Sequence, residues 1–451
     1  MRSDRLGNPV SCSVSALAGV DTFIDGFLRH RTTAPAILET AGAEPEEVLP
    51  NILSGYLWMF LEAPEAAAKA APYLDAAEAR LAGAHRREAM HASALRAWVD
   101  DDIPRVTTLC QAILEEHPRD LVALKIAQYH HFNQGDAPAM LRAALSVAAE
   151  NEGDAQYQAM AAFGFEECHL LDDAQRAAER AMAIERGEPW AHHAIAHVML
   201  TRGQIAEGTA FLEDVRDTWA GLNSFMYSHN WWHLALFRIS EGRLDEALAI
   251  YDDHCWGIEP GYSQDQVGAI SLLARLEFAG VAVGERWQEL RPWLAARATD
   301  TTQPFLALQY LYGLGRGEAR EAETLMQAVR EAAAREGDGG VWAEVAGPAA
   351  AGILAAARGD WPPAIRALSA ALPQLWRIGG SHAQRDLFEQ ILLHALMGDR
   401  RWTAAQQMLE GRRSYDPDGV PLNRMLAEVY GALDLPQPQA KALARLARHA
   451  H

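Results

Sequence analysis

Cysteine and long apolar runs are scarce in this chain of 451 residues. The four cysteines are widely spaced, with no CxxC pair: Cys12, Cys110, Cys168 and Cys255. This spacing argues against the disulfide framework of small secreted proteins and predicts reduced thiols. No apolar run reaches the roughly 18 residues that a membrane span needs. The N-terminus carries Arg2, Asp4 and Arg5 without a continuous apolar segment, so we expect no secretory signal and a cytoplasmic setting.

Positive charge is also in short supply. Lysine and arginine total 40 against 60 aspartates and glutamates, which gives a formal net charge of −20. Because binding phosphate requires clustered positive charge, this balance argues against nucleic acid or an anionic membrane as a principal partner. The one basic run is the C-terminal "KALARLARHAH", for which we expect a short capping helix.

Alternating β-branched runs are nearly absent, whereas Ala, Leu, Glu and Arg recur at helical spacing. Short turns that contain Gly-Asp or Gly-Arg separate these stretches, as in "FNQGDAP", "ISEGRLDEA" and "AARGDWPPA". A recurring turn of this kind is typical of an array of helical hairpins. The sequence therefore predicts an all-α, tetratricopeptide-like solenoid, and leaves open whether the superhelix closes around a central pocket.

The clearest repeat register places Gly242 at the fifteenth position of a 34-residue unit. The residues that then occupy the packing positions of the repeat are Trp231, Leu234, Ala235, Ala247 and Tyr251. The turn glycines are unevenly spaced, so the repeats are degenerate: Gly135, Gly203, Gly242, Gly359 and Gly398. We expect an N-terminal helical cap over residues 1–100 and a solenoid with a C-terminal capping helix over residues 101–451.

Two histidine pairs stand out against this regular background. His193 and His197 lie in "WAHHAIAHVML", and His229 and His233 lie in "MYSHNWWHLALF". Spacing of i,i+4 puts both members of a pair on one helix face. In the repeat register three of the four fall on the concave stripe of neighbouring helices, so imidazoles from both pairs could meet at one metal ion. An all-imidazole set suits Zn, Fe, Cu or Ni, and three histidines with one carboxylate would suit them equally.

Other polar residues are candidates for catalytic roles beside these histidines. "GGSHAQRDLF" supplies His382, Arg385 and Asp386 at a glycine turn that leads into a helix, and Arg385 could hold a substrate carboxylate. Asp386 or Glu166 would serve as the base, since neither histidine pair contains the glutamate of an HExxH motif. Each candidate also has a purely structural interpretation. The segment 382–386 could be an N-cap with a surface ion pair, and Glu166 could lie on a solvated helix face. The paired histidines could bind a peptide or form hydrogen bonds to backbone carbonyls.

Several of these strings together resemble the tetratricopeptide repeat protein 38 family. They are "DRLGNP", "HPRDLVALKIAQYHHFNQGD", "WAHHAIAHVML", "HNWWHLALF", "YDDH" and "GGSHAQRDLF". The resemblance runs along nearly the whole chain and implies a tetratricopeptide-like fold. It implies no settled activity.

Two functions remain open from the sequence. The first is a metal-dependent enzyme that acts on a small polar or anionic substrate, by hydrolysis or hydration, or by oxidation with a redox metal. The second is a non-catalytic adaptor that binds a peptide or protein in its groove, a frequent use of this architecture. Histidines and tryptophans at the groove positions favour the enzyme. The sequence does not decide whether the chain forms a homo-oligomer.

Overall fold

A computed structural model describes residues 2–449 of the chain, and nearly all of the secondary structure in these residues is helical. The fold is all-α and consists of consecutive antiparallel helices, as the sequence predicts. Among the helices of this described part, none combines the length and the apolar character of a membrane span. The chain divides into two compact units, which we describe separately.

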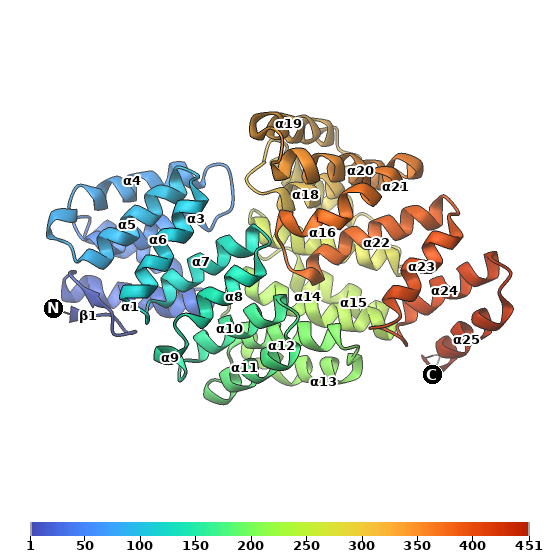
Figure 1. Ribbon diagram of the computed structural model, residues 1–451, viewed down its shortest axis with the longest axis horizontal. Coiled ribbons are helices and arrows are strands. Elements are labelled where there is room, and N and C mark those ends of the chain that lie inside the picture. Colours follow the sequence, from blue (N-terminus) through green and yellow to red (C-terminus); the bar gives the residue numbers. More distant parts are fainter. Residues whose placement is uncertain (1, 450–451) are drawn as a thin grey trace. The chain divides into compact units, whose positions relative to one another are not determined.

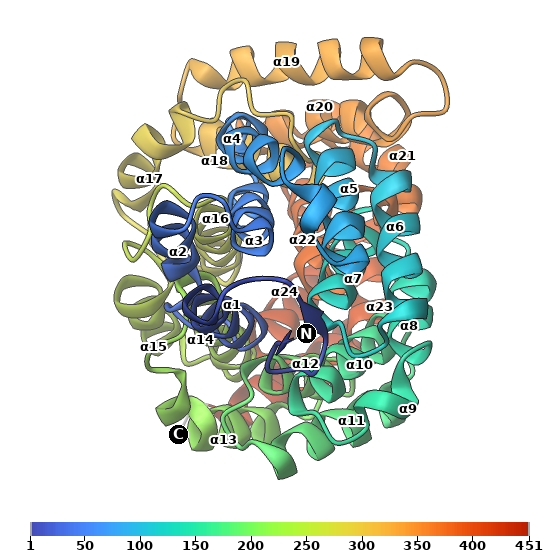
Figure 2. The ribbon, with the colours of Figure 1, turned by 90° about the vertical axis from the view of Figure 1, so that its left-hand side faces the viewer.

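The first unit comprises the chain up to Ala194 together with Thr218–Met226. Its N-terminal residues form a two-stranded antiparallel ladder of β1 (Arg2–Ser3) and β2 (Pro9–Val10). Its helices are α1 (Val14–Leu28), α2 (Ile37–Ala43), α3 (Val48–Met59), α4 (Ala66–Glu78), α5 (Arg86–Val99), α6 (Ile103–Glu116), α7 (Leu121–Asn133), α8 (Ala137–Leu145), α9 (Ala148–Asn151), α10 (Ala155–Glu167), α11 (Leu171–Ile184) and the start of α12 (Pro189–Thr201). Neighbours in sequence pack together, and α5, α6, α7 and α8 follow one another in this way (Figure 2). The expected boundary near residue 100 falls between two packed helices, α5 and α6, inside this unit.

The second unit comprises Ile195–Asp217 and the chain from Tyr227 onward. It contains the end of α12, α13 (Ile205–Val215), most of α14 (Ser224–Glu241), α15 (Leu244–Ile250), α16 (Ser263–Phe278), α17 (Arg286–Ala295), α18 (Pro304–Arg316), α19 (Glu321–Glu336), α20 (Gly347–Ala357), α21 (Trp361–Ala371), α22 (His382–Gly398), α23 (Trp402–Arg412), α24 (Val420–Ala432) and α25 (Pro436–Leu446). This unit also contains two π-helical turns, Tyr251–Cys255 and Trp342–Ala346. Figure 1 shows α18, α20, α21 and α22 as successive neighbours.

The hairpin packing depends on small residues at helix contacts. Gly352 of α20 faces α21, and a Cβ built on it would lie 2.9 Å from Leu368 Cγ. At the turn between α14 and α15, Gly242 has a φ of +76°, which favours glycine because it has no Cβ. The residues that the repeat register assigned to packing positions around this turn are all buried: Trp231, Leu234, Ala235, Ala247 and Tyr251.

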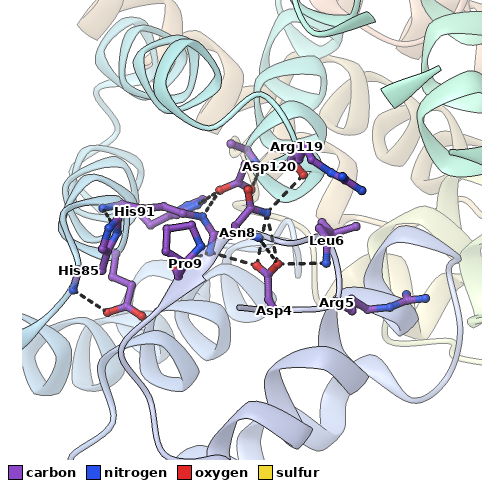
Figure 3. A network of polar contacts seen from close by, with 12 residues as sticks. Asp4, Arg5, Leu6, Asn8, Pro9, His85, His91, Arg119 and Asp120 are labelled. Carbon is purple, nitrogen blue, oxygen red and sulfur yellow. Dashed lines mark hydrogen bonds and ion pairs between the residues drawn. The ribbon is translucent and has the colours of Figure 1, made fainter. Parts of the chain in front are cut away.

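A buried ionic network fixes the N-terminal segment to α5 and to the N-cap of α7 (Figure 3). Arg87 Nε donates to Asp120 Oδ2 at 2.6 Å, and Arg87 Nη1 lies 3.1 Å from Asp4 Oδ2. His91 Nε2 lies 2.7 Å from the same Asp120 oxygen. Asp4 also accepts backbone N–H bonds from within its own turn, including that of Asn8 at 2.9 Å. The "DRLGNP" string thus has a structural use, since its aspartate and asparagine hold the first strand pair against the helices.

Candidate metal centre

Three helices of the second unit bring four histidines together. His197 lies near the end of α12, and His229 and His233 lie one turn apart on α14. His382 is the first residue of α22, directly after the N-cap Ser381, whose side chain forms a capping box with Gln384. The cap fixes the start of α22, and with it the position of the His382 backbone.

The imidazole rings lie close enough to share a ligand. Ring centroids are 4.7 Å apart for His197 and His233, 4.8 Å for His229 and His233, and 5.2 Å for His197 and His382. One ring nitrogen each from His197, His229 and His233 lies within 4.8 Å of the others. Nitrogens that bind one tetrahedral ion at 2.0–2.1 Å are roughly 3.4 Å apart. To bind one such ion, the three nitrogens would have to lie closer together than the upper limit of 4.8 Å on their spacing here.

Burial keeps the imidazoles of His229 and His233 in the neutral form. His197, His229 and His233 are 0%, 7% and 0% exposed. Burial, helped by the neighbouring His197, lowers the pKa of His229 to about 3. The pKa of His233 is lowered for the same reasons, with further contributions from His229, His382 and Arg275. Neutral imidazole is the form that binds metal ions, so no proton has to be displaced from His229 or His233 at neutral pH.

Arg275 of α16 connects the helices that carry the histidines. Its guanidinium lies 5.2 Å from the ring centroid of Trp232, and its Nη2 donates to the Ala383 carbonyl at 2.8 Å, next to His382. Trp232 in turn stacks on His229, with ring centroids 5.3 Å apart. Burial lowers the pKa of Arg275 to about 10, still high enough to keep the group charged at neutral pH. Arg275 therefore brings a fixed positive charge close to the imidazoles.

His382 also has a hydrogen-bonding partner in this unit and is half-buried. Its Nε2 lies 3.2 Å from Thr201 Oγ1, at the end of α12. The sequence assigned His382 to a separate cluster from the two histidine pairs, and the structure brings it next to His197. Neither Arg275 nor Thr201 was a candidate from the sequence. "LLARLEF" around Arg275 reads as an ordinary repeat helix, and no local pattern indicates its long-range contacts.

The two other candidates of α22 are engaged in ion pairs or backbone contacts. Asp386 forms an ion pair with Arg412 of α23 and accepts from Gln390 Nε2 at 2.6 Å. Burial would raise the pKa of Asp386, but Arg412 and Arg275 outweigh it and lower the pKa to about 2. A carboxylate with so low a pKa is a weak base. Arg385 Nη1 donates to the carbonyl oxygens of the preceding glycine turn, including that of Gly380.

The remaining two candidates are assigned to the first unit. His193 precedes His197 by one turn of α12, and its ring stacks on Trp190 with centroids 4.4 Å apart. Glu166 lies near the end of α10 and is fully buried. The second unit itself thus contains three of the four predicted metal ligands and His382.

A scan against protein-family models finds no match for this chain. Among solved structures, it is similar to the human IFIT1 dimer with m7Gppp-AAAA, at 12% identity over 97% of this chain and 95% of that one, with a TM-score of 0.42. It is also similar to the Cut9-Hcn1 hetero-tetramer of the APC/C (11% identity, 97% and 87% covered, TM-score 0.34). A third similarity is to the tetratricopeptide (TPR) domain of P58(IPK) (11% identity, 81% and 94% covered, TM-score 0.23). These distant likenesses carry no argument about function. The helices of the chain itself define its class, an all-α protein built of tetratricopeptide-like helical hairpins.

Proposed function

We propose that this protein is a metal-dependent enzyme of small-molecule chemistry whose transition-metal ion is bound by His197, His229 and His233. The observation that carries the proposal is the proximity of three buried imidazoles, each offering a nitrogen within 4.8 Å of the other two. Three imidazoles leave at least one coordination position for water or substrate, the arrangement found in catalytic rather than structural zinc sites. Zn, Fe, Cu and Ni all accept such a ligand set.

Each nearby side chain has a part in this proposal. A bound ion would activate water or polarise a substrate oxygen, and a redox metal would permit oxidation instead. His382 is placed beside His197 to exchange a proton with the substrate, and the charge of Arg275 favours a polar or anionic one. Asp386, held by Arg412, acts as a positioning group for α22. His193 as a fourth ligand, Glu166 as a base and Arg385 as a substrate clamp remain proposals that single variants test.

The first experiment is elemental analysis of protein purified without a histidine tag, before and after incubation with Zn²⁺ and gel filtration. We expect about one ion per chain. The variants His229→Gln and His233→Gln should lose it while keeping the circular dichroism of the parent. His394→Gln is the matched control, because His394 is a partly buried imidazole of the same unit, stacked on Phe278 and outside the cluster.

The test also separates the enzyme from an adaptor. A chain that binds no metal, and whose melting temperature is the same in chelator, would contradict the metal proposal and leave peptide binding in a groove as the better account. Loss of the ion in His193→Ala would add a fourth ligand to the site. We also propose that the chain belongs to the tetratricopeptide repeat protein 38 family and is located in the cytoplasm.

A further inference from the structure

Lysine is rare in this protein. Of the 40 lysines and arginines, only three are lysines: Lys69, Lys125 and Lys441. Lys69 and Lys441 are exposed on helix surfaces, whereas Lys125 lies partly buried on α7 of the first unit. The chain otherwise uses arginine for positive charge. Because arginine stays protonated in proteins and lysine can give up its proton, the lysine at position 125 has a chemistry that the common cation of this chain lacks.

The Lys125 amine is held in a defined position. Its Nζ donates to the Phe27 carbonyl oxygen at 2.6 Å and lies 3.0 Å from His30 Nε2. His30 follows Arg29, the C-cap of α1, and has a φ of +55°. The Arg31 N–H donates to the Gly26 carbonyl oxygen at 2.7 Å, which fixes the backbone at this turn. The amine is therefore presented by α7 and the imidazole by the turn that follows α1.

The surroundings of this amine are aromatic and only partly covered. Lys125 Nζ lies 4.7 Å from the ring centroid of Phe27, which contacts Phe60 at 5.1 Å. Phe60 contacts Tyr129, one turn after Lys125 on α7, at 4.8 Å. Lys125 and these three aromatic side chains are all partly exposed. A small apolar or aromatic molecule could thus lie against the rings and reach the amine.

In the part of the chain that the structure describes, Lys125 has no ion-pair partner that would hold its proton. Within residues 2–449, no carboxylate oxygen lies within 4.0 Å of its Nζ. The charge of Glu188 raises the pKa of Lys125 from a greater distance. The Glu188 carboxylate accepts hydrogen bonds from Gln156 Nε2 at 3.0 Å and from the Trp190 N–H at 3.2 Å. Burial lowers the pKa of Lys125 to about 7 against the opposing charge of Glu188, so the amine can lose its proton near neutral pH.

We propose that Lys125 is the nucleophile of a second site, in the first unit, that forms an imine with a small aldehyde or ketone carrying an aromatic or apolar group. The Nζ lone pair forms a bond to the carbonyl carbon, and the carbonyl oxygen takes up a proton to give a carbinolamine. Loss of the hydroxyl as water then leaves the carbon–nitrogen double bond. Amine and carbonyl thus give imine and water, and no oxidant or reductant is consumed.

His30 is the positioned acid–base group of this step. Its Nε2, 3.0 Å from Nζ, can take the proton that the amine loses and return it to the departing hydroxyl. The proposal does not depend on the metal centre, because every residue that it uses lies in the first unit and outside the histidine cluster. Failure of one proposal would leave the other unaffected.

The test is reductive trapping of the full-length chain with benzaldehyde and sodium cyanoborohydride at pH 7, followed by peptide mapping. We expect Lys125 to gain a benzyl group about ten times faster than Lys69 and Lys441, whose amines lie on exposed helix surfaces. The rate at Lys125 should rise through a midpoint near pH 7. The ratio of the labelling rate at Lys125 to that at the exposed lysines should be higher with benzaldehyde than with acetaldehyde.

Three variants sharpen the experiment. Lys69→Arg with Lys441→Arg leaves Lys125 as the sole lysine and should keep the full labelling. Lys125→Arg keeps the positive charge and should abolish it, and His30→Gln should slow it several-fold while leaving the labelling of Lys69 unchanged. Labelling of Lys125 no faster than that of Lys69 in the folded parent chain would overturn the proposal.

Discussion

Replacing Arg87 by methionine should destabilise the first unit more than almost any other single arginine change in it. Arg87 is 2% exposed and pairs with the side chains of Asp4 and Asp120, both fully buried. Methionine approximates the length of the arginine side chain but removes its charge and all five of its donors. Two carboxylates would then lie buried near each other without the cation that compensates them.

The magnitude follows from the burial of both partners. Removing one member of a buried ion pair costs about 3–5 kcal/mol, because the other charge stays uncompensated in a poorly solvating interior. Two features reduce the loss here: His91 still contacts Asp120, and Asp4 keeps its backbone donors. We therefore expect a loss of about 3 kcal/mol, at the lower end of that range.

Hydrogen–deuterium exchange of peptides from α5, α7 and the N-terminal strands measures this loss locally. A local readout is needed because two units need not unfold in one step. Arg86→Met is the control: Arg86 is the neighbouring residue and makes an exposed ion pair with Glu116. An exposed pair of this kind contributes about 1 kcal/mol or less. Equal effects of the two variants, or a loss below about 1 kcal/mol for Arg87→Met, would refute the reasoning.

Three further changes test the fold. Gly352→Val should lower the free energy of unfolding by about 1–3 kcal/mol, because a Cβ there meets Leu368 at 2.9 Å. Gly411→Ala is the control and should not destabilise the protein, because a Cβ there meets nothing within 4 Å. Urea denaturation compares the two variants. Burial lowers the pKa of His130 to about 3, so between about pH 6.5 and pH 3 the unfolded chain binds the extra proton and stability falls as the pH falls. In His130→Gln, the drop in stability between pH 7 and pH 5 should be smaller by about 2 kcal/mol, and an unchanged pH profile would contradict the buried neutral imidazole. Ser381→Ala removes the N-cap of α22 and should lower the free energy of unfolding by about 1 kcal/mol. Thermal melting measures this loss, and an unaltered melting temperature would mean that the cap contributes nothing.

The fold could be predicted from the sequence because its signals are local. Helix turns that need a left-handed residue select glycine, and Gly135, Gly203, Gly242 and Gly359 all have positive φ. Gly398 is different, since it is the last residue of α22 and the left-handed position falls on Arg400, with a φ of +56°. Degenerate repeats shift a turn by a residue or two without changing the hairpin, which is why the class of fold was easier to predict than its boundaries.

The candidate site was only partly accessible to the same reasoning. Spacing of i,i+4 is a local property, so His229 and His233 on one face of α14 follow from the sequence alone. The approach of His382 to His197 depends on how helices far apart in the chain pack, and no local pattern encodes it. The ion pair of Asp386 with Arg412 was missed for the same reason, and it changes the chemistry expected of that carboxylate.

X-ray absorption spectroscopy of the zinc-loaded protein tests the central claim most directly. The account predicts a first shell that contains three imidazole nitrogens at about 2.0–2.1 Å, completed by one or two light atoms, and loss of this shell in His229→Gln. A first shell with sulfur ligands, a shell of oxygen atoms alone, or a spectrum that His229→Gln leaves unchanged would contradict it.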